Sequence, residues 1–497
     1  MRDIRKIRQG LCGVIAENSL GLVLEKIHEA AKWGASLVEV RADFLQATVG
    51  LETILANSPL PTIATARRKA DGGMWKSSEE DRIQLLISLG KSSASAIDVE
   101  ADIFQQIPRD LPCARIVSFH DFSHTPGELK NLHCSLEELN PDFVKIACMA
   151  NSFADNGRML DLYALAKIPL LGFCLGGRGF STRLLALKMG SPWLYSTSPK
   201  AVINAPGIPS LEELAQIYGP RGPAVSGKIF GVVGDPISHS MSPLIHNCGF
   251  RDLGIDACYL PFQVGRDEFA NALAVLEKIP VMGYSVTIPH KENAARLAAT
   301  SSPLVKKLGS ANTLLRREKG FHAENTDAIA IVRSLETQGG GSVGGRKVLV
   351  LGAGGVGRAA VFSLKEAGYQ VILANRSEEK AARLAKEAGV QTLPWQDRAG
   401  FKEGILVNCT SLGMKPDLES TAWEKAWFTK KHLAFDAVYN PVQTRFLREA
   451  GEAGVPAITG VEMFVQQAGI QFKLFTGQDP PLEMMRQVVL EKLQTGG

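Results

Sequence analysis

Short apolar runs alternate with helix-like segments through the first 200 residues of the chain. Eight such runs have the length and the apolar content of buried parallel strands. They lie at 11–16, 37–42, 61–67, 96–100, 115–120, 143–148, 170–174 and 193–196. Segments with apolar residues at helical spacing lie between most of them, at 20–32, 79–89, 135–139 and 159–166. Eight strand–helix repeats predict a (β/α)8 barrel, with a doubly wound open sheet as the alternative.

Polar residues gather at the C-terminal ends of these runs, and this favours the barrel. Such ends form a single rim in a barrel, where enzymes of this fold place their chemistry. The rim residues are Glu39, Arg41, Asp43, Arg67, Asp71, Asp98, Glu100, His120 and Lys145, with Arg183 in the expected loop after the seventh run.

Lys145 stands inside an apolar run, which is unusual because burying an ammonium group is costly. Burial favours a neutral amine, which can attack a ketone. His120 on the neighbouring strand could shuttle protons, and the arginines of the rim suit a substrate that carries a carboxylate. The alternative for Lys145 is a structural ion pair or a side chain that extends to solvent.

The stretch 204–242 is dense in proline and glycine and contains one short helical piece at 211–218. So many proline and glycine residues in one stretch predict a boundary between two folded parts, with a long surface loop as the alternative.

Beyond this boundary, strands are expected at 228–233, 257–261 and 281–289, a helix at 267–277, and a hairpin between 310–314 and 324–327. Lys291 and Asp327 each follow an apolar run, which makes them candidates for a proton-relay pair. Ser240 and Ser242 stand before a helix, where they could hold a carboxylate or cap the helix.

The segment 347–357 reads as a strand that enters a glycine-rich turn. Gly352, Gly354 and Gly357 match G-x-G-x-x-G, and a helix at 356–367 and a strand at 370–374 supply the context of a dinucleotide-binding fold. Apolar runs at 404–409 and 433–438 continue the parallel sheet, and 460–477 is an amphipathic helix expected to cross back to the first lobe of this half.

The end of the second strand of this fold distinguishes the two nicotinamide cofactors. An NAD enzyme has an acidic residue there, whereas this chain has Asn375, Arg376 and Ser377, followed by Lys380. Arg376 could bind a 2′-phosphate, so the sequence predicts NADP. The alternative is an exposed arginine without a role.

Composition narrows the function further. The 497 residues allow about three domains, and 45% hydrophobic and 21% charged residues are ordinary for a globular protein. A net charge of +4 argues against a nucleic-acid partner, and no apolar run approaches the roughly 20 residues needed to span a membrane. The basic start lacks the apolar region of a signal peptide. The eight cysteines show no CxxC pair and no metal-ligand spacing, so we expect no metal and free thiols in a reducing compartment, the cytoplasm or a plastid.

Six motifs in the first half resemble type I 3-dehydroquinate dehydratase, over about residues 8–218. They are EVRAD (39–43), TAR with DGG (65–67 and 71–73), SFHDF (118–122), VKIA (144–147), GFSTR (179–183) and APG (205–207). The resemblance implies that Lys145 forms a Schiff base with the ketone of 3-dehydroquinate and that His120 is the general acid and base.

The same resemblance implies the substrate contacts of the first half. Glu39, Arg41, Arg67 and Arg183 would hold hydroxyl and carboxylate groups of the substrate. Asp71 would lie near the histidine, in a place where the family usually has Glu. The family usually reads SAPGQ where this chain reads NAPGI, so Asn204 and Ile208 replace a serine and a glutamine that contact substrate.

The second half resembles shikimate dehydrogenase across about residues 228–495. The motifs, in family order, are GDPISHSMSPLIHN (234–247), VTIPHK (286–291), ANTL (311–314), NTD (325–327), GAGGVG (352–357), NRS (375–377), DAVYNP (436–441) and QA (467–468). Ser285 and Ala330 are small departures, where Asn and Gly are usual. The resemblance implies that Lys291 and Asp327 are the catalytic pair.

The resemblance also assigns the other groups of this half. Ser240, Ser242 and Tyr439 would bind the substrate carboxylate, and Thr287, Asn312 and Gln467 its ring hydroxyls. The implied NADP contacts are Gly352, Ala353, Gly354, Gly355, Val356, Gly357, Asn375, Arg376, Ser377, Lys380, Met414, Gly460 and Met463.

The whole chain resembles the fused dehydroquinate dehydratase–shikimate dehydrogenases. The implied reactions are dehydration of 3-dehydroquinate to 3-dehydroshikimate and its NADPH-dependent reduction to shikimate, with these small molecules as partners and neither nucleic acid nor membrane. The expected organisation is a barrel at 1–218, a linker at 219–227, a substrate lobe at 228–335, a Rossmann NADP lobe at 336–459 and returning helices at 460–497. The alternatives are a quinate/shikimate dehydrogenase in the second half and a catalytically silent metabolite sensor.

Overall fold

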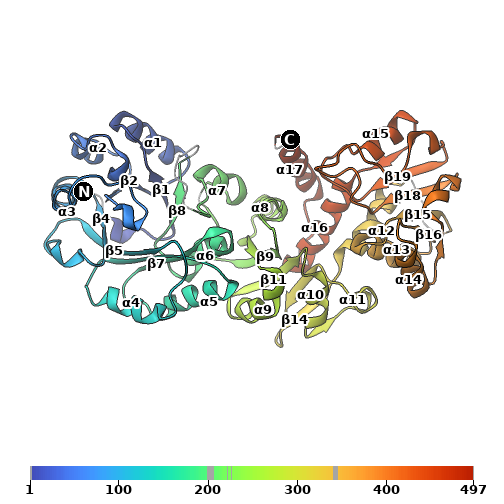
Figure 1. Ribbon diagram of the computed structural model, residues 1–497, viewed down its shortest axis with the longest axis horizontal. Coiled ribbons are helices and arrows are strands. Elements are labelled where there is room, and N and C mark those ends of the chain that lie inside the picture. Colours follow the sequence, from blue (N-terminus) through green and yellow to red (C-terminus); the bar gives the residue numbers. More distant parts are fainter. Residues whose placement is uncertain (1–2, 199–205, 221, 225, 340–344, 496–497) are drawn as a thin grey trace. The chain divides into compact units, whose positions relative to one another are not determined.

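The computed structural model (Figure 1) describes residues 3–198, 206–220, 222–224, 226–339 and 345–495. The chain divides into two compact units, Met1–Pro243 with Asp256–Val281 and Leu244–Ile255 with Met282–Gly497. The expected linker at 219–227 lies within the first unit. The assignment of the chain to a barrel, a linker, two lobes and returning helices stays a prediction.

The eight apolar runs of the first half form one parallel sheet in the order β7-β6-β5-β4-β3-β2-β1-β8. This sheet curls into a near-closed barrel, so the predicted (β/α)8 architecture is confirmed. The strands are β1 (Gly10–Ile15), β2 (Leu37–Arg41), β3 (Thr62–Thr65), β4 (Ala96–Glu100), β5 (Ala114–Asp121), β6 (Phe143–Met149), β7 (Leu170–Leu175) and β8 (Trp193–Thr197).

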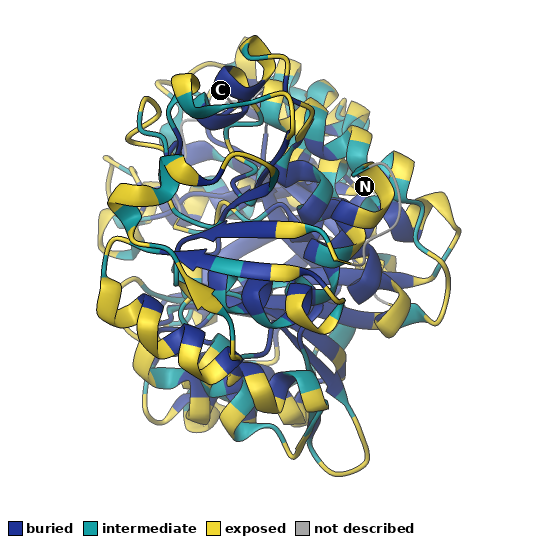
Figure 2. Ribbon diagram, turned by 90° about the vertical axis from the view of Figure 1, so that its right-hand side faces the viewer, coloured by how far each residue is buried: buried dark blue, intermediate teal, exposed yellow. Residues whose placement is uncertain are grey.

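Helices cover the outside of the barrel, and an apolar cluster that includes Ile116, Phe143 and Trp193 fills its inside. Along the whole described chain, buried residues concentrate on the strands, whereas many helix positions are exposed (Figure 2). The helices are α1 (Leu20–Lys32), α2 (Leu51–Ala56), α3 (Glu79–Ser92), α4 (Leu129–Glu137), α5 (Phe153–Asp161), α6 (Gly176–Met189) and α7 (Leu211–Tyr218).

Three of these helices differ from expectation. Helix α4 starts at Leu129, six residues before the expected 135. For α5 and α6 the structure shows a local reason. Arg183, expected in a loop, lies on α6, whose glycine-rich start resembles a loop in sequence. A side chain at Gly179 would come within 2.5 Å of the Cys174 backbone, so glycine there permits close packing of the helix on β7. Helix α5 starts at Phe153, six residues before the expected 159, because Ser152 and Asp155 form a capping box.

The first unit continues beyond the barrel with β9 (Lys228–Gly234), β10 (Ala257–Gln263) and α9 (Phe269–Lys278). Strands β9 and β10 pair in parallel. The Phe153 amide donates to Glu268 Oε1 (3.2 Å), and Lys188 Nζ donates to the carbonyl of Gly227 (2.9 Å). These bonds attach the last residue of the expected linker to α6 and the segment after the linker to α5.

The second unit contains a mixed sheet and a fully parallel sheet. In the mixed sheet, β11 (Val281–Val286) pairs antiparallel with β13 (Thr313–Arg316), which pairs antiparallel with β14 (Phe321–Glu324), and β12 (Thr300–Ser301) lies parallel to β14. Its helices are α8 (Ser242–Asp252), α10 (Lys291–Leu297), α11 (Pro303–Leu308) and α12 (Thr326–Gln338). Part of α8, Ser242 and Pro243, belongs to the first unit.

The parallel sheet runs β17-β16-β15-β18-β19-β20, the order of a Rossmann fold. Its strands are β15 (Lys347–Leu351), β16 (Gln370–Ala374), β17 (Gln391–Thr392), β18 (Gly404–Asn408), β19 (His432–Asp436) and β20 (Ala457–Ile458). The helices that follow are α13 (Gly355–Glu366), α14 (Glu378–Ala388), α15 (Arg445–Glu452), α16 (Gly460–Thr476) and α17 (Leu482–Thr495).

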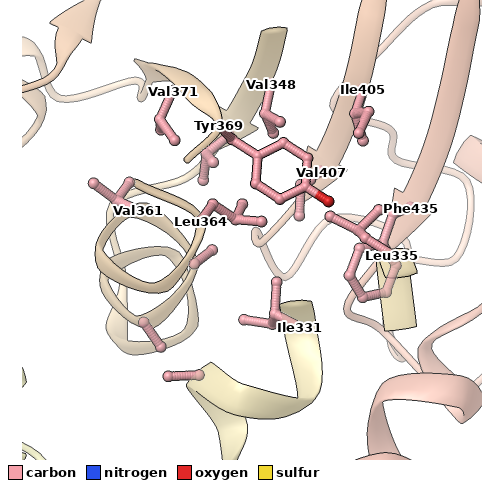
Figure 3. Close-up of a cluster of buried hydrophobic side chains, with 14 of the residues drawn as sticks. Ile331, Leu335, Val348, Val361, Leu364, Tyr369, Val371, Ile405, Val407 and Phe435 are labelled. Atoms are coloured by element: carbon pink, nitrogen blue, oxygen red, sulfur yellow. The ribbon is translucent and has the colours of Figure 1, made fainter. Parts of the chain in front are cut away.

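One apolar cluster fixes α12 and α13 against this sheet (Figure 3). Val348, Val407 and Phe435 from the strands meet Ile331 from α12 and Leu364 from α13. Since Asp327 lies in the first turn of α12, this core also positions a candidate catalytic residue.

Candidate active sites

A cavity of about 200 Å³ lies at the C-terminal rim of the barrel. Charged groups from strands far apart in the sequence meet there, as the barrel prediction requires. The seven residues proposed for this site all line the cavity: Glu39, Arg41, Arg67, Asp71, His120, Lys145 and Arg183.

Lys145 on β6 is buried among groups that hold its ammonium. Its Nζ lies 2.8 Å from Asp98 Oδ2 and 3.3 Å from Glu39 Oε2. It also lies 4.2 Å from the centre of the Tyr195 ring. The ion-pair interpretation of Lys145 therefore describes its contacts in the structure.

Asp98 links Lys145 to Arg67, whose Nη2 donates to Asp98 Oδ1 at 2.7 Å. Burial alone would raise the pKa of Asp98, but the charges of Arg67 and Lys145 hold it well below its ordinary value. Asp98 is therefore a permanent anion beside the reactive amine. It was visible in sequence as a rim residue on β4, but nothing in the pattern connected it to Lys145.

His120 on β5 is the neutral group of the site. Burial, together with the charges of Arg67 and Lys145, lowers its pKa well below the ordinary value. An uncharged imidazole can accept a proton, which is the role expected of a general base. His120 Nδ1 has no partner among the described residues. Asp71 lines the same cavity, and its carboxylate accepts from Arg68 Nε at 2.5 Å.

Arg183 on α6 is a buried cation without a carboxylate partner in the described part of the chain. Its guanidinium lies 4.3 Å from the centre of the Phe173 ring, and its Nε makes no hydrogen bond within the described residues. Burial lowers its pKa to about 9. Because an unpaired buried charge is costly, a carboxylate in the cavity would satisfy it.

Arg41 is held more firmly, since it donates two bonds to Asp43, at 2.9 and 2.7 Å. Asp43 also accepts from the Met74 amide (2.9 Å), which fixes the segment that follows Asp71. Ile208 lines the cavity as an apolar wall. Asn204 lies outside the described residues.

Lys291 and Asp327 form the predicted pair of the second half. Lys291 starts α10, Asp327 lies in the first turn of α12, and Lys291 Nζ approaches Asp327 Oδ2 to 2.6 Å. The distance of 2.6 Å is short enough for proton transfer. The side chains of Lys291 and Asp327 are 31% and 14% exposed, so a ligand can still reach the pair. Thr287 precedes α10, and its carbonyl accepts from the His290 amide (2.9 Å).

Asn312 is fixed by Thr326, whose amide donates to Asn312 Oδ1 at 2.7 Å. Gln471 on α16 donates to the Asn312 carbonyl (3.1 Å) and accepts from Ser285 Oγ (2.7 Å). Gln471 was missed in the sequence because it looks like one more polar residue of an amphipathic helix. Since its buried amide ties α16 to the mixed sheet, it holds Asn312, a predicted substrate contact, in place.

The glycine-rich turn has the shape of a phosphate cradle. Gly352 has φ +109°, and a Cβ on Gly357 would lie 2.0 Å from the Gly352 carbonyl oxygen, so both positions require glycine. Gly354 and Gly355 face open space, and no side chain caps the N-terminus of α13. Free N–H groups at this terminus suit a pyrophosphate, so these residues fit a dinucleotide.

The residues proposed for the adenosine end lie beside this turn. Asn375 Oδ1 accepts from the Ala353 amide at 3.0 Å, which joins the end of β16 to the glycine loop. Arg376 and Lys380 are exposed, and neither forms an ion pair within the described chain. Ser377 caps α14. Two free cations therefore border the position where a 2′-phosphate would lie.

The remaining predicted contacts are less closely tied together. Tyr439 stacks on Phe464, with 4.9 Å between the ring centres, and Gln467 donates to the Phe464 carbonyl (3.2 Å). Met463 is buried and Met414 is 44% exposed. Gly460 packs against the Val438 carbonyl, 2.2 Å from a would-be Cβ. Ser240 and Ser242 lie in the first unit, where the Ser242 amide donates to Ser240 Oγ (3.3 Å).

Asp436, at the end of β19, is a buried carboxyl that sequence reasoning did not single out. Oδ1 accepts from Asn408 Nδ2 (2.9 Å) and from the Val438 amide (3.0 Å), and Oδ2 accepts from Thr444 Oγ1 (2.5 Å). No cation pairs with it among the described residues, and burial raises its pKa to about 7. It anchors the chain just before Tyr439.

This shift predicts a pH dependence of stability. The raised pKa means that native Asp436 keeps its proton from about pH 4 up to about 7, where the unfolded chain has lost it. Its contribution to the free energy of unfolding is therefore lost as pH rises toward 7. We expect Asp436→Asn to reduce the fall in Tm of the second unit between pH 5 and pH 8. Parallel Tm profiles of variant and parent would contradict this.

Family models match both halves of the chain. The family model for type I 3-dehydroquinase matches residues 11–223, and models for the shikimate dehydrogenase substrate-binding domain, for shikimate/quinate 5-dehydrogenase and for the shikimate 5′-dehydrogenase C-terminal domain match 232–314, 334–403 and 460–490.

Individual relatives match either the whole chain or one half of it. The chain is 34% identical over 515 residues to the chloroplastic bifunctional 3-dehydroquinate dehydratase/shikimate dehydrogenase of Arabidopsis thaliana, covering 98% of this chain and 85% of the relative. It is 39% identical to the NADP(+) shikimate dehydrogenase of Methanosarcina mazei, covering 54% of this chain and 99% of the relative.

The second half also matches a solved structure. The shikimate 5-dehydrogenase of Thermus thermophilus in complex with NADP(H) and shikimate is 33% identical, with a TM-score of 0.50, and the match covers 53% of this chain and 99% of that one. With a relative that matches almost the whole length, the chain belongs to the family of bifunctional 3-dehydroquinate dehydratase/shikimate dehydrogenases.

Proposed function

We infer that the chain dehydrates 3-dehydroquinate to 3-dehydroshikimate and reduces this product with NADPH to shikimate. The observation that carries the inference is the presence of two complete catalytic sets in one chain. A buried Lys145 lies beside Asp98 at 2.8 Å in the barrel, and Lys291 lies beside Asp327 at 2.6 Å in the second unit. Consecutive chemistry on one chain supports both assignments, and the presence of both sets argues against a silent sensor.

In the dehydration, Arg183 receives the substrate carboxylate, because its buried guanidinium lacks a partner in the described chain. Lys145 transfers a proton to the neutral His120, and its free amine attacks the ketone. His120 returns the proton to the hydroxyl of the adduct, which leaves as water and gives the imine. His120, which is neutral, removes the proton α to the imine carbon and then protonates the departing hydroxyl, which leaves as water. Hydrolysis of the imine restores Lys145.

In the reduction, the glycine-rich turn at 352–357 and Arg376 hold the dinucleotide, which when bound supplies the hydride. Lys291 donates a proton to the oxygen of the ketone. Asp327, 2.6 Å away, orients the ammonium of Lys291 and stabilises its charge. Asn312, fixed by Thr326 and Gln471, holds a ring hydroxyl of the substrate.

One coupled assay tests the proposal. The full chain supplied with 3-dehydroquinate and NADPH should consume NADPH and form shikimate, without any added enzyme. Consumption with added 3-dehydroshikimate but not with 3-dehydroquinate would contradict the first activity, and the reverse failure of reduction would contradict the second. Turnover of quinate at a rate similar to that of shikimate would favour a quinate/shikimate dehydrogenase.

Arg376 predicts the choice of cofactor. Arg376→Ala should raise KM for NADPH about 10–100-fold, because charge-assisted bonds to a phosphate are worth about 1.5–3 kcal/mol. NADH has no 2′-phosphate, so its use should change little. Glu379→Ala, an exposed change on α14, is the matched control. Equal use of NADPH and NADH by the unmodified chain would contradict the assignment.

We propose a reducing compartment for the chain, the cytoplasm or a plastid. All eight cysteines are free, and the Arabidopsis relative is named chloroplastic. No helix in the described residues is long and apolar enough to cross a membrane. Recovery of a tagged chain from an oxidising compartment would contradict the proposal.

A further inference from the structure

A row of alternating charges leads from the outer surface of the barrel to the reactive amine. It begins at Glu79 on α3, which is the part nearest to solvent, with its side chain 36% exposed. It ends at Lys145 in the cavity, whose side chain is 6% exposed. The row runs Glu79, Arg82, Glu100, Arg67, Asp98, Lys145.

Arg82 is a buried charged residue of this row that does not line the cavity. It lies on α3, outside the sheet, yet its side chain is fully buried and is not part of the cavity wall. Nη1 donates to Glu100 Oε2 (2.6 Å) and to the carbonyl of Ala66 (2.8 Å), at the end of β3. Nε and Nη2 donate to Glu79 at 2.9 and 2.5 Å. A fully desolvated guanidinium with this many partners holds its neighbours in one geometry.

Glu100 and Arg67 connect Arg82 to the residues of the cavity through shared ion pairs. Glu100 is shared between Arg82 on one oxygen and Arg67 Nη1 on the other, the latter at 2.9 Å. Arg67 is in turn shared between Glu100 and Asp98 (2.7 Å). The position of Arg67 is therefore set by its attraction to two carboxylates, Glu100 and Asp98. Arg82 neutralises part of the charge of Glu100.

Loss of Arg82 would upset this balance in a defined direction. Glu100 would be left with Arg67 as its only cation among the described residues, and a buried carboxylate draws its remaining cation more strongly. Arg67 would move toward Glu100 and away from Asp98. Asp98 would then hold the ammonium of Lys145 more tightly, and the free amine needed for attack would form less readily.

We propose that Arg82 is a positioning residue for the dehydration, acting through Glu100 on Arg67 and Asp98 to keep Lys145 ready to react. This inference rests on the proposed Schiff-base function of Lys145. It differs from a purely structural role, in which Arg82 only joins α3 to β3 and β4 and affects the number of folded barrels.

The test separates the rate per active chain from the number of active chains. Full-length parent, Arg82→Met and Arg82→Lys are incubated with 3-dehydroquinate and borohydride together, so that each imine is trapped irreversibly as it forms, and samples taken at increasing times are weighed by intact mass spectrometry. The final amount of adduct reports the fraction of barrels that are folded. The approach to that amount reports the rate of imine formation, and steady-state kcat and KM are measured alongside.

We expect Arg82→Met to trap to the same final amount as the parent but about 10²-fold more slowly, because displacements of about 1 Å in a catalytic group have costs of this size. The kcat of dehydration should fall in parallel. KM should rise by less than kcat falls, because Arg67, a predicted substrate contact, shifts while Arg183 is untouched. Arg82→Lys should recover about tenfold, since it restores the charge without the fork. Lys91→Met, an exposed change on the same helix, should match the parent.

Several results would overturn the proposal. An unchanged rate with a reduced final amount would leave Arg82 a structural residue only. If Arg82→Met gives no adduct at all, Arg82→Lys decides, and a parent-like rate in that variant overturns the positioning role. Failure of the parent to form an adduct on Lys145 would instead contradict the proposed function of the barrel.

Discussion

Lys145→Ala should abolish dehydration of 3-dehydroquinate while reduction of 3-dehydroshikimate continues. We expect a loss of about 10⁴-fold or more in kcat, a size seen when a covalent nucleophile is removed from an enzyme. The reason is geometric, because Lys145 is the one lysine among the described residues that line the cavity. The NADPH-dependent activity, which we assign to Lys291 and Asp327 in the other unit, should stay within about twofold of the parent.

Borohydride trapping checks the chemistry behind this loss. Adding borohydride during turnover should fix one substrate-derived group, and peptide mapping should place it on Lys145. Lys130→Ala, an exposed lysine change on α4, should leave both trapping and turnover unchanged. His120→Ala should still trap the imine, since the amine is present, but release product very slowly. An adduct on another lysine would remove Lys145 from the mechanism.

The barrel was predictable because its strands are buried on both faces. Such strands appear as apolar runs, and a charged residue inside a run, such as Lys145 on β6, is conspicuous. The end of each run marked the catalytic rim, so the cavity residues could be named before their positions were known. Helix α6 was harder to predict, because its start carries the close-packing Gly179 and reads as a loop.

The links between the catalytic residues could not be predicted from sequence. Asp98 lies next to Lys145 because β4 and β6 flank β5 in the sheet. Which charged residues pair across the strands of a sheet cannot be read from the order of residues in one sequence. Arg82 and Gln471 look like ordinary polar residues of amphipathic helices, yet both are fully buried. Burial of a polar side chain depends on the neighbouring element, so the residues that support a site are less visible than those that form it.

Asp71 lies where its motif implied, but its hydrogen-bond partner could not be inferred from the resemblance to the family. Its motif implied a place beside His120, and both residues do line the cavity. The side chain of Asp71 nevertheless accepts from Arg68, which also pairs with Asp102 at 2.7 Å. An aspartate is one methylene shorter than glutamate, and a nearby arginine offers it a closer partner than the histidine.

Lys291→Met should remove reduction of 3-dehydroshikimate as selectively as the change at Lys145 removes dehydration. We expect kcat for reduction to fall about 10²–10⁴-fold, the usual contribution of a positioned general acid. Lys291 lies at the start of α10, with its Nζ 2.6 Å from Asp327, and the glycine-rich turn lies on other elements. Binding of NADPH, followed by its fluorescence, should therefore be unchanged.

The partner residue turns this into a test of the pair. Asp327→Asn should also lower kcat, because the amide cannot stabilise the ammonium of Lys291 as the carboxylate does. Residues that act as one unit are not additive, so the double variant should be little worse than Lys291→Met alone. Lys306→Met, an exposed change on α11, should leave both activities intact. If the two losses multiplied instead, Lys291 and Asp327 would act separately, and the 2.6 Å contact would not be the proton-donating pair.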